Sequence, residues 1–329
     1  MSSAPAPPIA AHGLVRTFGD VRAVDGVDLE VAEGEIFGFL GPNGAGKSTT
    51  VRMLTTLLRP TDGTATVAGF DVVREPARVR ASIGVALQDA AIDPLMTGRE
   101  LLHLQATLYG IGRRAGRDRS EVLLDRVGLT EAADRLVGGY SGGMRRRLDL
   151  ALALMHEPAV LFLDEPTTGL DPMSRLNLWG EVRRLNTELG TTVFLTTQYL
   201  EEADELAHRV AIIDHGSIVR EGTPATLKSE VGLPTLLIDV DPGDEERTHE
   251  ALVGVGEPRP ARAGRVAVGL YAGAAGAADA VRALDAAGVS IHHMELNTPS
   301  LDDVFAEATG RRLEGAGDTT AEVGSEDVS

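Results

Sequence analysis

The segment GPNGAGKST at residues 41–49 constrains the fold of this 329-residue chain more than any other feature. It follows EIFGFL at residues 35–40, an almost unbroken apolar run that is typical of a strand buried on both faces. It precedes apolar residues at helical spacing between Lys47 and Leu58. The order strand, G-x-x-x-x-G-K-[ST], helix predicts a loop whose backbone amides turn toward a phosphate. We name residues 41–49 the phosphate loop.

The side chains of the phosphate loop suit a nucleoside triphosphate. Lys47 brings a positive charge to the β- and γ-phosphates, and Ser48 offers a hydroxyl ligand to Mg²⁺. Lysine is scarce in this chain, which has 29 Arg but only Lys47 and Lys228, and this scarcity supports a specific role for Lys47. The predicted ATP-binding residues of the loop are Gly41, Pro42, Asn43, Gly44, Ala45, Gly46, Lys47, Ser48 and Thr49.

A second acidic element, VLFLDEP at residues 160–166, complements the phosphate loop. Its apolar run predicts a buried strand, which places Asp164 at the carboxyl end. There the Asp164 carboxylate can hold Mg²⁺ through water, and Glu165 can act as the general base toward an attacking water. An Asp-Glu pair alone is a weak signal, but together with the phosphate loop it predicts hydrolysis of a nucleoside triphosphate.

Strand and helix patterns alternate through the first two thirds of the chain, which favours a mainly parallel α/β sheet. Residues 97–156 are mostly of helical pattern, whereas the pattern after residue 230 indicates a small α+β domain. The expected strands are 82–87, 160–163, 192–196 and 209–214, then 235–240, 265–270 and 290–296. The expected helices include 174–188, 277–288 and 301–310, the last one capped by Ser300 with Asp303.

Charge divides the chain at the same place. The net charge is −18, and residues 230–329 hold 7 basic and 19 acidic side chains against 24 and 30 in residues 1–229. Such an acidic surface repels nucleic acid, so we expect no nucleic-acid partner. The chain has no Cys, which excludes disulfides and thiolate chemistry. Residues 1–8 and 311–329 are expected to be disordered tails.

Neither a membrane span nor a leader is expected. No apolar run reaches the roughly 18–20 residues that a membrane-spanning helix needs. The first residues, MSSAPAPP, lack the basic start and apolar core of a signal peptide. We therefore expect a cytoplasmic protein, for which any role at the membrane depends on a partner.

A third motif, YSGGMRRR at residues 140–147, separates this chain from other phosphate-loop proteins. We name it the signature segment, because here the chain closely resembles the ATP-binding subunits of ABC transporters. The resemblance implies that Ser141, Gly142 and Gly143 face an ATP held by the phosphate loop of a second copy, and hence a homodimer with shared sites. The last three residues of the signature segment, Arg145–Arg147, are interpreted as a solvated helix face.

The same resemblance assigns roles to four more residues. Gln88 matches a glutamine that contacts Mg²⁺ or the attacking water, so the implied Mg²⁺ set is Ser48, Gln88 and Asp164. Asp171 in TTGLDP matches an aspartate that crosses the dimer interface. Phe18 resembles an aromatic residue that stacks on adenine, although a core aromatic remains an alternative. Gln198 stands where a catalytic histidine usually contacts the γ-phosphate.

The departures from the common pattern resemble one branch of the family, the daunorubicin/doxorubicin-resistance type of exporter ATPase. The segments that carry this resemblance are YSGGMRRR, TTQYLEEADELAHRVAIIDHG and TPSLDDVF. It is close over residues 9–230 and looser over 231–310.

That branch implies an ATP-binding domain at 9–229 with a RecA-like parallel core, an antiparallel β subdomain and a helical subdomain at about 93–156, followed by an accessory α+β domain at 230–310. It also implies a separate membrane-embedded permease, to which the transported compound mainly binds. ATP hydrolysis at the cytoplasmic membrane face would then drive export of hydrophobic drugs or natural products.

Two other classes of protein remain open at this point. One is a non-transport ABC ATPase acting in DNA repair or translation, although the sequence shows no long coiled coil, zinc module or second cassette. The other is a phosphate-loop GTPase or kinase, against which the missing N-K-x-D element and the signature segment argue. The sequence names neither the transported compound and the permease nor the role of residues 230–310.

Overall fold

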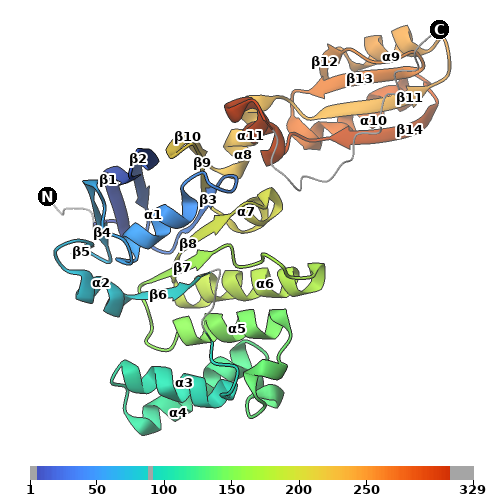
Figure 1. The fold of residues 1–329 in the computed structure, drawn as a ribbon. Coiled ribbons are helices and arrows are strands. Elements are labelled where there is room, and N and C mark those ends of the chain that lie inside the picture. Colours follow the sequence, from blue (N-terminus) through green and yellow to red (C-terminus); the bar gives the residue numbers. More distant parts are fainter. Residues whose placement is uncertain (1–5, 88–91, 312–329) are drawn as a thin grey trace, which may run out of the picture. The chain divides into compact units, whose positions relative to one another are not determined.

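The computed structural model describes residues 6–87 and 92–311 (Figure 1). They form two compact units, one ending at Pro224 and one beginning at Ala225. No helix in the described ranges is long and apolar enough to cross a membrane. Residues 1–5 and 312–329 of the tails expected to be disordered lie outside these ranges. Pro8 also belongs to an expected tail but lies within the described residues, and its carbonyl accepts a hydrogen bond from Ala68 N at 2.7 Å.

A six-stranded sheet forms the centre of the first unit, in the order β10-β9-β3-β8-β7-β6. The five strands from β9 to β6 pair in parallel, and β10 pairs antiparallel with β9. Every residue of β3 and β7 is buried, which explains their unbroken apolar sequences. The strands are β3 (Ile36–Leu40), β6 (Ile83–Ala86), β7 (Val160–Asp164), β8 (Thr192–Thr197), β9 (Arg209–Asp214) and β10 (Ser217–Gly222).

Helices connect these strands, as parallel pairing requires. The helices of this core are α1 (Lys47–Leu54), α2 (Pro76–Ser82), α6 (Pro172–Leu189) and α7 (Leu200–Leu206). Parallel strands joined in this way bring their carboxyl ends to one edge, where β3 leads into the phosphate loop and β7 ends at Asp164. The predicted mainly parallel α/β core is confirmed.

Two smaller parts complete the first unit. An antiparallel sheet in the order β2-β1-β4-β5 consists of β1 (Ile9–Phe18), β2 (Val21–Val31), β4 (Asp62–Val67) and β5 (Phe70–Asp71). The helical part consists of α3 (Gly98–Leu108), α4 (Arg113–Arg126), the short 3₁₀ turns η1 (Thr130–Ala132) and η2 (Val137–Gly139), and α5 (Gly142–Ala153). Leu102, Leu124 and Leu148 join these helices in one buried cluster.

The second unit has a four-stranded antiparallel sheet in the order β12-β13-β11-β14. Leu236, Ile238 and Val268 of this sheet bury against Leu252 and Leu284 of two helices. Its elements are α8 (Pro224–Val231), β11 (Thr235–Val240), α9 (Glu245–Leu252), β12 (Gly256–Arg259), β13 (Arg265–Leu270), η3 (Gly273–Gly276), α10 (Ala277–Ala286), β14 (Ile291–Asn297) and α11 (Leu301–Thr309).

The expected strands at 235–240, 265–270 and 209–214 have the observed bounds. The capping pair of Ser300 and Asp303 at the start of α11 is also confirmed. Sequence patterns missed the short helices α7 and α9, because seven or eight residues give too little periodicity to recognise.

Candidate nucleotide-binding site

The phosphate loop requires glycine at two positions for steric reasons. A Cβ on Gly41 would lie 2.3 Å from the Ile213 carbonyl oxygen, because β9 passes directly beside the loop. Gly46 has a φ of 110°, which side chains rarely adopt, and its Cβ would lie 2.6 Å from the Ala23 carbonyl oxygen. The loop is therefore held close to two neighbouring backbones, and α1 begins directly after it at Lys47.

Lys47 is buried, with 4% of its surface exposed, and its charge is already oriented. Its Nζ donates to the carbonyl oxygens of Gly41 at 2.6 Å and Pro42 at 3.1 Å, and lies 3.2 Å from Glu165 Oε1. Burial lowers the pKa of Lys47, while the neighbouring carboxylates of Glu165 and Asp164 oppose that shift. A phosphate entering the loop meets an ammonium group that the fold has placed in advance.

Asp164 and Ser48 meet at the end of β7, although 116 positions separate them in the chain. Ser48 Oγ donates to Asp164 Oδ1 at 3.2 Å, and Thr196 Oγ1 donates to the same oxygen at 2.5 Å. The Thr196 hydroxyl also accepts from Glu165 N at 3.1 Å. Thr196 therefore orients both acidic residues. Sequence reasoning missed it, because only the pairing of β7 with β8 brings it there.

Glu165 occupies an unusual backbone position. Its φ is 48°, in the left-handed region that non-glycine residues avoid, and only 6% of its surface is exposed. Besides Lys47, its carboxylate accepts a hydrogen bond from Thr168 Oγ1 at 3.3 Å. Strain of this kind persists where surrounding contacts hold it and is common at catalytic sites. The geometry suits a base that acts on a water next to the phosphate loop.

The signature segment begins α5 and exposes its first residues. Ser141 is the N-cap of α5 and accepts from Met144 N at 3.2 Å, while Ser141 and Gly142 remain exposed. Among the described residues, no hydrogen bond joins them to the phosphate loop of the same chain. A Cβ on Gly143 would lie 2.8 Å from Ser174 Oγ, so glycine lets α5 approach α6 closely.

Asp171 lies at the other side of this contact, as the N-cap of α6. It accepts hydrogen bonds from Ser174 N at 3.0 Å and Ser174 Oγ at 2.6 Å. The side-chain bond from Ser174 lowers the pKa of Asp171, followed by the backbone bond from the same residue. Asp171 is exposed, and its hydrogen-bond partner Ser174 packs against Gly143. Gly143 and Asp171, which the resemblance places at the dimer interface, therefore lie at the starts of two neighbouring helices.

Three further predicted residues lie at different places. Phe18 is 46% exposed at the end of β1 with the Arg16 guanidinium 4.4 Å above its ring, so the alternative of a core aromatic was wrong. Gln198 directly follows β8 and is half-buried. Gln88 lies outside the described residues.

The interpretation of Arg145–Arg147 as a solvated face was wrong for two of the three residues. Arg145 is exposed, but Arg146 is largely buried, and Arg147 donates to the Val127 carbonyl oxygen at 2.7 Å. Successive residues turn by about 100° around a helix, so a run of three cannot all face solvent when α5 packs on two sides. The sequence did contain a hint of the burial of Arg146. Asp149 lies three positions after it, a spacing at which opposite charges on a helix can pair.

Comparisons with known proteins show which family the chain is similar to. The profile of the family described as ABC transporter matches residues 24–168. The chain is 47% identical over 310 residues to the daunorubicin resistance ATP-binding protein DrrA2 of Streptomyces coeruleorubidus, covering 93% of this chain and 96% of that protein. It is 42% identical over 311 residues to the doxorubicin resistance ATP-binding protein DrrA of Mycobacterium tuberculosis, covering 92% and 93%.

A solved structure is similar in fold. The dimeric structure of a post-hydrolysis state of the ATP-binding cassette MJ0796, bound to ADP and Pi, has a TM-score of 0.59 and 26% identity, covering 65% of this chain and 98% of that chain. Since the match with DrrA2 covers 93% of this chain, it extends from the unit with the phosphate loop into the second unit.

Proposed function

The chain belongs to the ATP-binding subunits of ABC transporters and hydrolyses ATP, and from this premise we propose that it drives export of hydrophobic drugs or natural products through a separate permease. One observation supports the assignment of the catalytic site. Lys47, Ser48, Asp164 and Glu165 converge at one edge of the parallel sheet, with Lys47 Nζ 3.2 Å from Glu165 Oε1. The export part rests on the two resistance proteins, which match nearly the whole chain.

Lys47, Glu165 and Gln198 have separate tasks in hydrolysis. Lys47 and the loop amides stabilise negative charge on the transferred phosphoryl group. Glu165 accepts a proton from the attacking water, with Thr168 holding its second carboxylate oxygen. Gln198, at the end of β8, donates an amide hydrogen bond near the γ-phosphate.

The oxygen donors beside the loop fit Mg²⁺. Ser48 Oγ and Asp164 Oδ1 lie 3.2 Å apart, and we propose that they hold the ion with Gln88. One hydroxyl and one carboxylate suit this ion, because Mg²⁺ keeps several waters and phosphate oxygens among its ligands. Bound Mg²⁺ would neutralise phosphate charge.

A second copy of the chain completes the site in this proposal. Ser141 and Gly142 are exposed at the start of α5, where backbone amides and the helix dipole favour an anion. The partner copy would present them to ATP in the phosphate loop, with Asp171 at the same interface. The dimeric state of MJ0796 supports this arrangement.

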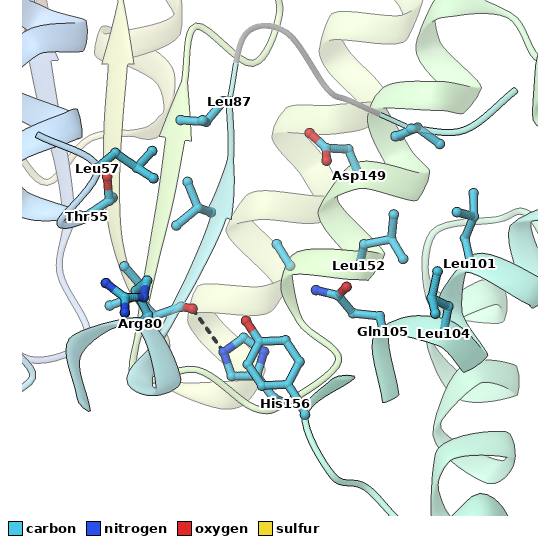
Figure 2. Close-up of a pocket in the computed structure, with 15 residues that line it drawn as sticks. Thr55, Leu57, Arg80, Leu87, Leu101, Leu104, Gln105, Asp149, Leu152 and His156 are labelled. Carbon is cyan, nitrogen blue, oxygen red and sulfur yellow. Dashed lines mark hydrogen bonds between the residues drawn. The ribbon is translucent and has the colours of Figure 1, made fainter. Parts of the chain in front are cut away.

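The permease would bring the subunit to the cytoplasmic membrane face. Exposed apolar side chains for such a contact lie in and around the helical part of the first unit, and they include Leu57, Leu95, Leu104 and Leu108. Leu57 and Leu104 line a cavity of about 460 Å³ between the sheet core and the helices (Figure 2). An apolar, hollowed surface of this kind is typical of a protein-binding site.

We expect Leu95→Asp to uncouple transport from ATP hydrolysis. Leu95 is 80% exposed, so the substitution costs the fold little but places a charge where an apolar partner would pack. Efflux from cells that co-express the permease should fall several-fold, while basal ATPase activity of the purified chain is retained. Leu95→Met keeps an apolar surface and serves as the control. Unchanged efflux by the aspartate variant would contradict a permease contact at this position.

We expect Gln198→His to change the pH dependence of hydrolysis. An imidazole titrates near a pKa of about 6.5, whereas an amide keeps the same charge at every pH. The variant should hydrolyse ATP faster than the native chain, and its rate should vary more steeply between pH 6 and pH 8. Steady-state ATPase assays with Gln198→Asn as the amide control measure the effect. Equal rates for native and histidine chains across this range would show that Gln198 does not face the γ-phosphate.

The whole proposal is tested by purification with a co-expressed permease. ATPase activity should rise when hydrophobic drugs are added to the complex in lipid, and not when DNA or ribosomes are added to the chain alone. Stimulation by DNA or ribosomes instead would favour a non-transport ABC ATPase.

A further inference from the structure

The Arg146 side chain makes an unusual set of contacts inside the first unit. Its guanidinium donates to three backbone carbonyl oxygens: Leu87 through Nη1 at 2.6 Å, Asp164 through Nη2 at 3.0 Å and Pro166 through Nε at 2.9 Å. Only 10% of the side chain is exposed. Hydrogen bonds from a charged donor are stronger than neutral ones, and burial strengthens them further.

These three carbonyls belong to the segments that carry catalysis in the proposed function. Asp164 and Pro166 are the two neighbours of Glu165, so Arg146 donates hydrogen bonds to the backbone on both sides of the proposed base. Leu87 is the last described residue before Gln88 and follows β6. Arg146 itself lies on α5, the helix that begins with the signature segment. One side chain thus joins α5 to the ends of β6 and β7.

Asp149 extends this connection to the cavity. Its Oδ2 lies 3.3 Å from Arg146 Nη1, one turn further along α5. Burial raises the pKa of Asp149 to about 6, which the charge of Arg146 partly opposes. Figure 2 shows the Asp149 carboxylate and the Leu87 side chain on the wall of the cavity between the sheet core and α3. Both partners of the Arg146 Nη1 atom therefore line that cavity.

We propose that Arg146 is a positioning residue for Glu165: it holds the backbone on both sides of the base in the strained geometry that hydrolysis requires, and Asp149 holds Arg146. This inference rests on the proposed catalytic role of Glu165. The φ of 48° at Glu165 needs surrounding contacts to persist. Thr196 holds the amide of Glu165 itself, and the bonds from Arg146 to Asp164 and Pro166 hold the residues on either side of it.

Lysine cannot replace arginine in this role. The planar guanidinium has five N–H donors in a fixed fork. Here Nε and Nη2 bond to the two neighbours of Glu165, and Nη1 bonds to Leu87 after β6. A lysine ammonium is a single point with three donors, which cannot reach both Leu87 and Pro166 in this arrangement. Arg146→Lys keeps the charge and most of the volume but frees the backbone next to Glu165.

The test compares Arg146→Lys with Arg145→Lys in the full chain. The neighbouring Arg145 lies on the same helix but is exposed, so its substitution controls for the loss of an arginine. We expect Arg146→Lys to lower kcat for ATP about tenfold or more with KM for ATP changed less than about twofold, because Lys47 and the phosphate loop remain intact. Arg145→Lys should change neither constant.

A second measurement separates positioning from general damage to the fold. In a Glu165→Gln background the base is already absent, so Arg146→Lys should leave ATP-dependent dimer formation unchanged by gel filtration. An unchanged kcat in Arg146→Lys overturns the proposal. So does a parallel loss of ATP binding and dimer formation, which would assign Arg146 to the structure of the site as a whole.

Asp149→Asn covers the case in which Arg146→Lys does not fold. It keeps the side-chain shape but removes the ion pair that holds the Arg146 guanidinium against the three carbonyls. We expect a several-fold lower kcat with the KM for ATP unchanged, and a native kcat would overturn the proposal. Failure of either variant to show the effect leaves the proposed role of Glu165 as the base standing, since loss of turnover in Glu165→Gln tests that role separately.

Discussion

Glu165→Gln is expected to stop ATP turnover while ATP binding persists. Glutamine has nearly the same shape and can still accept a hydrogen bond from Thr168 Oγ1, but it cannot take a proton from water. Removing a general base costs roughly 10²–10⁴-fold in rate. It also removes the negative charge 3.2 Å from Lys47 Nζ, which leaves the ammonium group more available to ATP phosphates.

Two assays follow this variant. Phosphate release measures turnover, and gel filtration with ATP measures the size of the particle. We expect a dimer that forms with ATP, persists in Glu165→Gln and dissociates in the native chain as ATP is consumed. ADP in place of ATP is the control and should give a monomer. A glutamine variant that hydrolyses ATP at the native rate would contradict the assignment of Glu165 as the base.

Lys47→Ala is expected to remove most ATP binding, and with it hydrolysis. The Nζ atom is buried and held by the Gly41 and Pro42 carbonyls at the position where the phosphates enter. Its loss also leaves Glu165 as an uncompensated carboxylate beside an incoming anion. We expect an affinity at least about tenfold weaker, which corresponds to ~1.4 kcal/mol.

Titration with a fluorescent ATP analogue measures that affinity directly. Lys47→Arg is the more demanding variant, because the larger guanidinium must fit a site with 4% exposure and two close carbonyls. We expect it to fail as well, in a chain that uses arginine almost everywhere else. Lys228→Arg changes the other lysine, in the second unit, and should bind ATP normally. Native affinity in Lys47→Ala would show that the phosphates bind elsewhere.

The sequence predicts a site residue where a short segment determines both its chemical type and its position. The phosphate loop places Lys47 and Ser48 one after the other at the start of α1, and the apolar strand β7 places Asp164 at its end. In each case a buried strand and its direct continuation determine where the side chain lies. The convergence of these segments then follows from parallel strands, whose carboxyl ends share an edge.

Thr196 and Arg146 could not be placed in this way. Thr196 gains its role because β8 pairs with β7, so that Thr196 lies opposite Asp164 in the register. The sequence pattern predicts that Arg146 is solvated with Arg145 and Arg147, and only the packing of α5 against the ends of β6 and β7 turns it inward. Both depend on neighbours that lie far away in the sequence.

The phosphate loop, the acidic strand end and the signature segment can be identified from the sequence, because glycine conformations, strand burial and helix starts are local properties of the chain. The polar groups that hold these elements against one another depend on tertiary packing. A hydrogen bond such as Arg146 to the Leu87 carbonyl spans 59 positions, and its existence depends on how helices and strands pack rather than on the residues beside it.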